Sequence, residues 1–377
     1  MKTPPSSPGP ELALADEFCS ERLTLAREKR KLTKQDLADL CGVSRRTITS
    51  WERGDIENPL IELLAEKLGF PAQYFLTGDP AVVDQDTISF RALSSATSRQ
   101  VHSAMAAASI AIEMSEWIDK RYQLPNVVFP DNQEPAGLSP VLTAEAIRSF
   151  WDVPPGPVKN MFVALERRGV RIFSLPSSDR EIDAFSFWRE SKPFIFVNPE
   201  RSAERIRFDL AHELGHLVLH RDRSLGRSRT IEQEANDFAS AFLVPADSLY
   251  PQVVGQLRYE DVFKLKTYWR VSALAMVERL WRLDLITEWV RRRWIIELTQ
   301  QGFRHGEPRG MTHERSRLLR EVLEKSREDG WTMHRMAKDM RVGQSDLDSL
   351  VFGMGHSVVD GAGQSGPRPV GHLRRVQ

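Results

Sequence analysis

The sequence has few cysteines and no long apolar run. Of its 377 residues only Cys19 and Cys41 are cysteines, which excludes a disulfide framework and a cysteine-based zinc finger. No apolar stretch approaches the ~20 residues that span a bilayer. The first residues, MKTPPSSPGPE, lack the apolar core of a signal peptide. We therefore expect a cytoplasmic protein with no membrane partner.

The charges balance over the whole chain but not locally. Lysine plus arginine and aspartate plus glutamate each number 52, whereas residues 20–53 hold nine basic residues against five acidic ones. This basic segment predicts a series of short helices. Thr33 is placed to cap a helix that ends at Gly42, and Ser44 is placed to cap the next one.

Two short helices joined by residues 41–43 form a helix-turn-helix, whose second helix can lie in the major groove of DNA. The exposed side of that second helix carries side chains that can read base edges, namely Arg45, Arg46, Thr47, Thr49 and Ser50. Gln35, near the start of the preceding helix, is placed to contact a phosphate. A helical bundle with a solvated basic face gives the same pattern, so the pattern alone leaves both interpretations open.

The stretch LTKQDLADLCGVSRRTITSWERG resembles the Cro/CI-like helix-turn-helix family, also called the xenobiotic response element (XRE) type. The resemblance implies that Arg45, Arg46 and Ser50 lie in the groove and that double-stranded operator DNA is a partner. A homodimer would place two such helices on a DNA site with two-fold symmetry.

The motif HELGH begins at His212, within a stretch, AHELGHLVLH, that otherwise has the pattern of a buried helix. His212 and His216 are one helical turn apart and point the same way, so their imidazoles can meet one zinc ion. Glu213 lies beside them and can take a proton from a bound water. The alternative is a buried helix whose histidines reach solvent at their tips, and a third protein ligand would decide between the two.

Two candidates for that third ligand follow the motif directly. His220 lies roughly 12 Å from His212 along the helix axis, which is too far to share the ion, so we expect it to cap the helix end. Asp222 stands where a metzincin would place its third ligand, but the glycine that such a turn needs is missing. Asp209, one turn before His212, is expected to be merely polar.

Two further candidates lie on a helix predicted over 231–243. Glu232 shares the core-facing stripe of this helix with Asn236, one turn later. A ligating glutamate supported by an asparagine outside the ligand set is the arrangement that two-histidine zinc hydrolases use. Glu234 lies off this stripe and is the reserve candidate.

The stretch RIRFDLAHELGHLVLH, followed by EQEANDFASAFLVP, resembles the ImmA/IrrE family of gluzincin-type metallopeptidases. The resemblance covers residues 144–245. It implies one zinc ion (Zn2+) per chain, held by His212, His216 and Glu232, with Glu213 as the base. It also implies a protein substrate, often a repressor that holds a stress or mobile-element programme off.

The segments around the motif predict the remaining architecture. Short runs rich in β-formers predict strands over 169–173 and 193–198. The alternating residues 184–188 predict an edge strand that can bind a substrate backbone by strand addition. From residue 257 onward the pattern is helical, and two segments there fit either further helix-turn-helix units or a helical packing domain.

These patterns predict an α+β fold that is mostly helical, with a five-helix N-terminal domain and a small β-sheet in the HExxH peptidase domain. The expected boundaries are a disordered tail over 1–17, the DNA-binding domain over 18–80, the zinc peptidase domain over 87–250 with its core at 144–245, a helical C-terminal region over 251–353 and a disordered tail over 354–377. The expected function is a DNA-binding regulator with a zinc-dependent endopeptidase. The alternative is a transcription factor whose zinc domain is only a sensor or scaffold.

Overall fold

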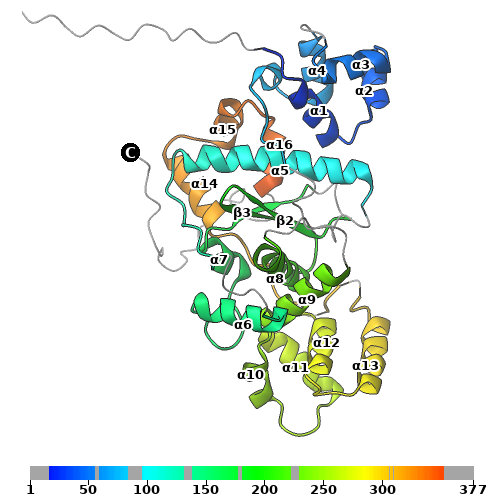
Figure 1. The fold of residues 1–377 in the computed structure, drawn as a ribbon, viewed down its shortest axis with the longest axis vertical. Helices are drawn as coiled ribbons and strands as arrows, with labels where there is room; N and C mark the ends of the chain where they lie inside the picture. The colour runs from blue at the N-terminus through cyan, green and yellow to red at the C-terminus, as the bar shows by residue number, and fades with distance from the viewer. Residues whose placement is uncertain are drawn as a thin grey trace, which may run out of the picture.

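The computed structural model describes residues 17–55, 59–83, 96–130, 138–176, 181–221, 229–304, 306–308 and 310–351. The expected tail over 354–377, nearly all of the tail over 1–17, and Asp222 lie outside these described residues. The molecule is elongated, with the N-terminal helices at one end, a small sheet in the middle and a helical group at the other end (Figure 1). Within the described residues, no helix is long and apolar enough to span a membrane.

The N-terminal helices form a compact group around a helix-turn-helix. They are α1 (Ser20–Lys29), α2 (Lys34–Cys41), α3 (Arg45–Glu52), α4 (Ile61–Leu68) and the 3₁₀ helix η1 (Ala72–Leu76). Thr33 and Ser44 accept the backbone N–H groups that begin α2 and α3. Gly42 ends α2 at a φ of 68°, a left-handed conformation that glycine adopts without a steric penalty. The five-helix prediction is thus confirmed, with its last helix reduced to a 3₁₀ turn.

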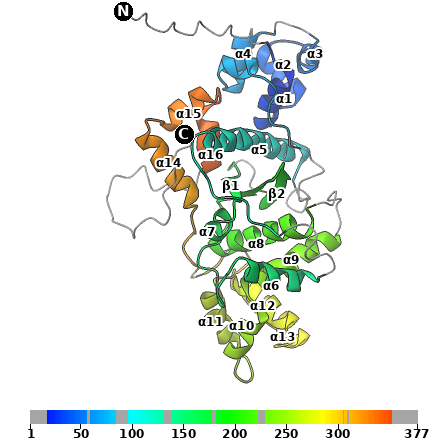
Figure 2. The same ribbon diagram turned by 60° about the vertical axis from the view of Figure 1, so that its left-hand side comes forward.

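A long helix, α5 (Ser98–Asp119), crosses the molecule between this group and the sheet (Figures 1 and 2). It packs on α1. Arg22 of α1 and Glu113 of α5 form an ion pair of 2.8 Å, and the Arg22 side chain also donates to the carbonyls of Thr77 and Gly78. The N-terminal group is therefore fixed to the rest of the chain by buried contacts.

The central sheet contains three strands within the described residues, β1 (Arg171–Ser174), β2 (Ala184–Arg189) and β3 (Lys192–Val197). β3 lies in the middle, parallel to β1 and antiparallel to β2, so β2 occupies an edge as predicted. The first strand begins two residues later than expected. Gly169 adopts a φ of 83° in the turn after α7, and a side chain there would collide with the backbone of Val127.

Four helices lie on the side of the sheet where the HELGH motif is found, and one of them carries the motif. They are α6 (Pro140–Phe150), α7 (Met161–Glu166), α8 (Ala203–Leu219) and α9 (Arg229–Leu243). α8 packs against β2 and β3 on one side and against α9 on another. The chain then continues through α10 (Ala246–Leu249) and η4 (Tyr250–Gln252).

The C-terminal region is helical, as predicted, but its two halves lie apart, one beside α9 and the other beside α5 (Figures 1 and 2). The half next to α9 comprises α11 (Tyr259–Trp269), α12 (Ala273–Arg282) and α13 (Glu288–Gln300). The other half returns to α5 and β1 and comprises α14 (Leu318–Glu328), α15 (Met333–Asp339) and α16 (Gln344–Val351). Asp346 of α16 pairs with Arg30, which follows α1 as its C-cap residue, so this half also contacts the N-terminal group.

Candidate functional site

The HELGH motif lies in the middle of a buried helix. Ser202 caps α8 by accepting the backbone N–H of Arg205, and the helix then runs for 17 residues between the sheet and α9. His212, Glu213 and His216 are 6%, 3% and 3% exposed. Because polar groups are buried only where partners satisfy them, the partners of these three side chains define the site.

His212, His216 and Glu232 bring three ligand atoms to one point. The two histidine Nε2 atoms are 3.0 Å apart, and the Glu232 carboxylate oxygens lie 3.3 Å from Nε2 of His212 and 3.5 Å from Nε2 of His216. Ligands about 2.05 Å from a tetrahedral zinc ion are about 3.3 Å from one another. The spacing and the donor types therefore fit zinc, and the same three residues form a possible metal cluster among the described residues.

Asn236 orients the first histidine. Its Oδ1 lies 3.2 Å from Nδ1 of His212, so Nδ1–H can donate to the amide while Nε2 faces the other two ligands. The sequence pattern suggested that Asn236 would support the glutamate. The structure places its amide oxygen on the histidine.

His220 and Glu234 meet behind His216, away from the triangle that His212, His216 and Glu232 form. His220 ends α8 as the C-cap residue, through its backbone N–H to the carbonyl of His216. Its buried side chain turns inward, with Nδ1 3.1 Å from Nδ1 of His216 and Nε2 2.8 Å from Glu234. The reserve candidate therefore contacts His220 in this structure, whereas Glu232 contacts His212 and His216.

The carboxylate of Glu213 is held by a residue that sequence reasoning missed. The hydroxyl of Ser186, on β2, donates to Oε2 of Glu213 at 2.6 Å. Ser186 is buried on the strand face that meets α8, where Trp188 also donates to the carbonyl of Leu217. A polar residue alternating with Phe185 and Phe187 was the signal, because a serine on the core-facing side of a strand needs a buried partner.

Gly215, inside the motif, lets α9 approach α8. A Cβ atom at this position would lie 3.1 Å from the ring of Phe238 and 3.3 Å from the backbone of Ala235. Both distances are shorter than ordinary van der Waals contacts, so a larger residue would push α9 away. Gly215 thus permits the approach that brings Glu232 to the histidines.

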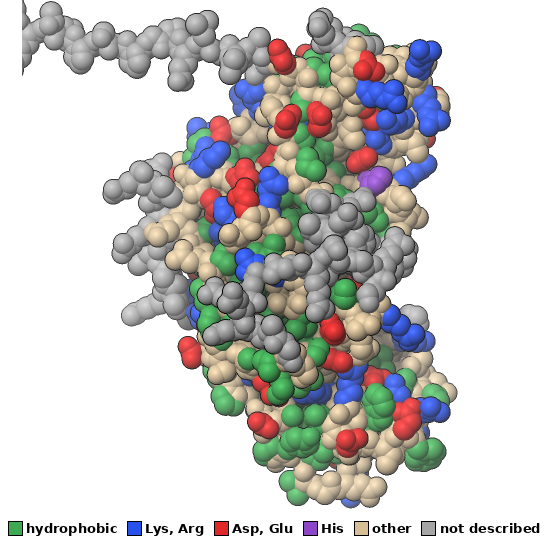
Figure 3. Space-filling view, in the orientation of Figure 1, with side chains coloured by type: hydrophobic (Ala, Val, Ile, Leu, Met, Phe, Trp, Pro, Cys, Tyr) green, Lys and Arg blue, Asp and Glu red, His purple; other side chains and the backbone are tan. Residues whose placement is uncertain are grey.

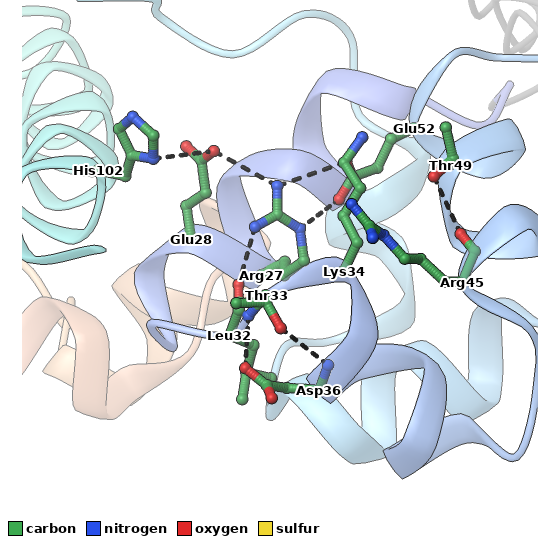
Figure 4. A network of polar contacts seen from close by, with 10 residues as sticks. All are labelled: Arg27, Glu28, Leu32, Thr33, Lys34, Asp36, Arg45, Thr49, Glu52 and His102. Carbon is green, nitrogen blue, oxygen red and sulfur yellow. Dashed lines mark hydrogen bonds and ion pairs between the residues drawn. The ribbon is translucent and has the colours of Figure 1, made fainter. Parts of the chain in front are cut away.

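The second predicted site, on α3, is exposed. Arg45 and Arg46 point into solvent, and Lys and Arg side chains gather over this edge of the molecule (Figure 3). Thr47 and Thr49 are partly buried, and the Thr49 hydroxyl donates to the carbonyl of Arg45 (Figure 4). Gln35 is exposed on α2, where its amide donates to Asp39 at 2.7 Å.

Ion pairs beneath α3 fix its orientation. Glu52, at the end of α3, accepts hydrogen bonds from the Arg27 guanidinium of α1 and pairs with Lys34 of α2 at 2.8 Å (Figure 4). Ile48 and Trp51 are buried against the same core. The exposed arginines therefore project from a helix that is held on its other side.

Comparison with known protein families identifies both regions. Residues 23–75 match the family model described as helix-turn-helix, and residues 165–280 match the peptidase family model described as the IrrE N-terminal-like domain. The chain combines a helix-turn-helix domain with an IrrE-like domain. This confirms both resemblances noted in the sequence, and the first match supports DNA binding. No curated protein matches the chain.

An open cleft of about 640 Å³ adjoins the triangle in the IrrE-like domain and is lined by Asn236. Phe208, one turn before His212, contributes apolar surface, and its ring centre is 6.4 Å from that of the histidine. Leu274 and Phe303 also line the cleft.

Asp209 lies one turn before His212 and is buried. Burial raises the pKa of its carboxyl to about 7, against the opposing effect of Arg205, which pairs with it at 3.0 Å. Arg205 also pairs with Asp183, just before β2. These contacts tie the start of α8 to the sheet.

Proposed function

We propose that this protein is a DNA-binding regulator whose IrrE-like domain is a zinc-dependent endopeptidase of the gluzincin type. It would cleave a repressor or another regulatory protein and so derepress stress or mobile-element genes. The observation that carries the proposal is the triangle of His212, His216 and Glu232 beside the buried Glu213. A site that only stabilised the fold would need no base next to the ligands.

The residues divide the chemistry between them. Two neutral imidazoles and one carboxylate would hold the ion. Zinc, when bound, would polarise the scissile carbonyl and make a water molecule more acidic. Glu213, held at Oε2 by Ser186, would accept the proton of the attacking water and return it to the leaving amine.

The substrate is proposed to be a protein segment in extended form. β2 lies along α8 with one edge open among the described residues, and its backbone could pair with such a segment. Asp183, just before β2, also lines the cleft, so the start of this strand lies next to the cleft.

The helix-turn-helix domain is proposed to select where the peptidase acts. Arg45, Arg46, Thr47, Thr49 and Ser50 would face operator DNA, with Gln35 at a phosphate, and a homodimer would bind a two-fold site. Co-localisation on DNA can give effective concentrations of about a millimolar, so the cleft itself need not bind tightly. A regulator bound at the same operator is therefore the preferred substrate.

A cleavage assay tests this function. Wild-type and Glu213→Gln proteins would be incubated with DNA-binding regulators that occupy the same operator, with and without that DNA, and with casein. We expect zinc-dependent cleavage of one regulator by the wild type alone, faster with operator DNA, and almost none of casein. Rapid digestion of casein, or equal cleavage by both proteins, would contradict the proposal.

A further inference from the structure

A third histidine, the C-cap residue of α8, lies directly behind the metal triangle. The side chain of His220 is fully buried, and its two ring nitrogens contact two different residues. Nδ1 lies 3.1 Å from Nδ1 of His216, and Nε2 lies 2.8 Å from Oε2 of Glu234. These contacts form a hydrogen-bond chain that runs from Glu234 on α9 through His220 to His216 in the triangle.

The position of one proton fixes the others in this chain. Nε2 of His216 faces the triangle, so a ligating His216 must be neutral and carry its proton on Nδ1. That N–H can donate to His220 only if Nδ1 of His220 is unprotonated. A neutral His220 then carries its proton on Nε2, which donates to the Glu234 carboxylate, an acceptor only. All three contacts are satisfied by this one arrangement.

We infer that His220 and Glu234 are positioning residues that hold His216 in the tautomer and orientation needed to bind the metal. The inference rests on the proposed zinc site. Glu232 and Glu234 then have separate roles on α9, the first as a ligand and the second as the end of the hydrogen-bond chain. Outer hydrogen bonds of this kind typically change metal affinity by about 10- to 100-fold.

Asn236 provides the same support to the other histidine through a single amide oxygen. The two ligands therefore differ in what lies behind them, because His212 is held by a neutral amide and His216 by a chain that ends in a carboxylate. The carboxylate makes the acceptor nitrogen of His220 more basic and strengthens its bond to His216.

Zinc affinity, measured by competition with a chelator, tests the inference. We expect His220→Leu, which removes the acceptor, to bind zinc roughly 10- to 100-fold more weakly than wild type. Glu234→Gln should show a smaller loss, and His220→Gln, whose side-chain oxygen can still accept, should retain most of the affinity. Asp237→Asn is the control, since it removes a carboxylate of α9 that pairs with Arg282 outside the triangle.

A double variant distinguishes a connected hydrogen-bond chain from two independent contacts, because the losses of zinc affinity add up only if the contacts are independent. Because Glu234 acts through His220, the double variant His220→Leu/Glu234→Gln should bind zinc no more weakly than His220→Leu alone. Additive losses would overturn the chain. Should the His220 variants fail to fold, nitrogen NMR of the wild-type zinc protein decides the matter, because a proton on Nδ1 of His220 contradicts the arrangement.

The outcomes also distinguish this inference from the proposed function. If the wild type binds no zinc, the zinc peptidase proposal fails. If the wild type binds zinc and Glu234→Gln and His220→Leu bind it equally well, only the positioning role is overturned. Lower thermal stability of the zinc-free variants with unchanged zinc affinity would likewise reduce both residues to a structural role.

Discussion

The two predicted functional helices place their side chains in opposite environments. On α3, Arg45 and Arg46 are exposed, and the helix is fixed from behind by Glu52. On α8, His212, Glu213 and His216 are almost fully buried, and each contacts a polar group of another residue, namely Asn236, Ser186 and His220. The backbone of α3 is therefore held in place while its arginine side chains reach into solvent. In α8 the functional side chains themselves are held by hydrogen bonds.

The roles proposed for the two sites explain this difference. Metal binding and proton transfer require atoms held in place before the substrate arrives, and burial with paired hydrogen bonds provides this. DNA recognition requires long cationic side chains that can reach base edges and phosphates. Substitutions on α8 should therefore abolish metal binding or proton transfer, whereas substitutions on α3 should weaken DNA binding by degrees.

The largest expected effect is loss of the metal. His212→Ala, His216→Ala or Glu232→Ala removes one of three ligands, so each purified variant should lose the single zinc ion expected per chain. Metal analysis of the purified proteins measures this directly. The choice of ligand is wrong if Glu232→Ala retains full zinc while Glu234→Ala loses it.

On α3, the expected effect is graded. Removing Arg45 or Arg46 should cost about 1–3 kcal/mol on the preferred DNA site and relax the preference at the base each one reads. Gln35→Ala should weaken binding to all sequences alike. The charge-matched control is Arg292→Ala/Arg293→Ala on α13, at the opposite end of the molecule (Figure 1). Unchanged DNA binding in an Arg45→Ala/Arg46→Ala protein would show that α3 does not read the DNA sequence.

An effect of similar size is expected when the hydrogen bond that supports Glu213 is removed. Ser186→Ala deletes a hydrogen bond to a carboxylate, a contact worth about 1.5–3 kcal/mol, so kcat should fall roughly ten- to a hundredfold while zinc stays bound. Ser186→Thr should restore part of the activity. Ser115→Ala, which removes another buried hydroxyl, is the control. Equal kcat in Ser186→Ala and wild type would show that the bond has no catalytic role.

A separate effect concerns stability and pH. The pKa of Asp209 is about 7 in the folded protein against an ordinary 3.8, so the folded state favours the protonated form. The free energy of unfolding should therefore fall as pH rises from about 4 to about 7, and this fall should be reduced in Asp209→Asn. Denaturant unfolding of the zinc-free proteins at several pH values measures the difference. Parallel curves for the two proteins would contradict the raised pKa.

Local features of the fold were predictable because their causes are local. Thr33, Gly42 and Ser44 set the ends of α2 and α3 through caps that depend on a few adjacent residues. The spacing within HELGH likewise needs only the geometry of one helix. The choice between Glu232 and Glu234 was harder, since it depends on how α9 is rotated against α8.

Long-range features were not predictable from these patterns. The bond from Ser186 to Glu213 joins residues 27 positions apart, and the alternation of Ser186 with Phe185 and Phe187 indicates only that the serine needs a buried partner, not which one. The return of α16 to the N-terminal group rests on the pair of Arg30 and Asp346, separated by 316 positions. Amphipathic patterns predict that a helix packs, but they do not predict its partner.

The peptidase interpretation, as opposed to a zinc domain that only senses or supports, is tested most directly by a Glu213→Gln strain. The substitution removes the proton acceptor and leaves His212, His216 and Glu232 in place, so the protein should keep its zinc and its fold. We expect that the target genes are no longer induced in this strain. Normal induction of the target genes with zinc still bound would contradict the peptidase interpretation and favour a zinc domain that only senses.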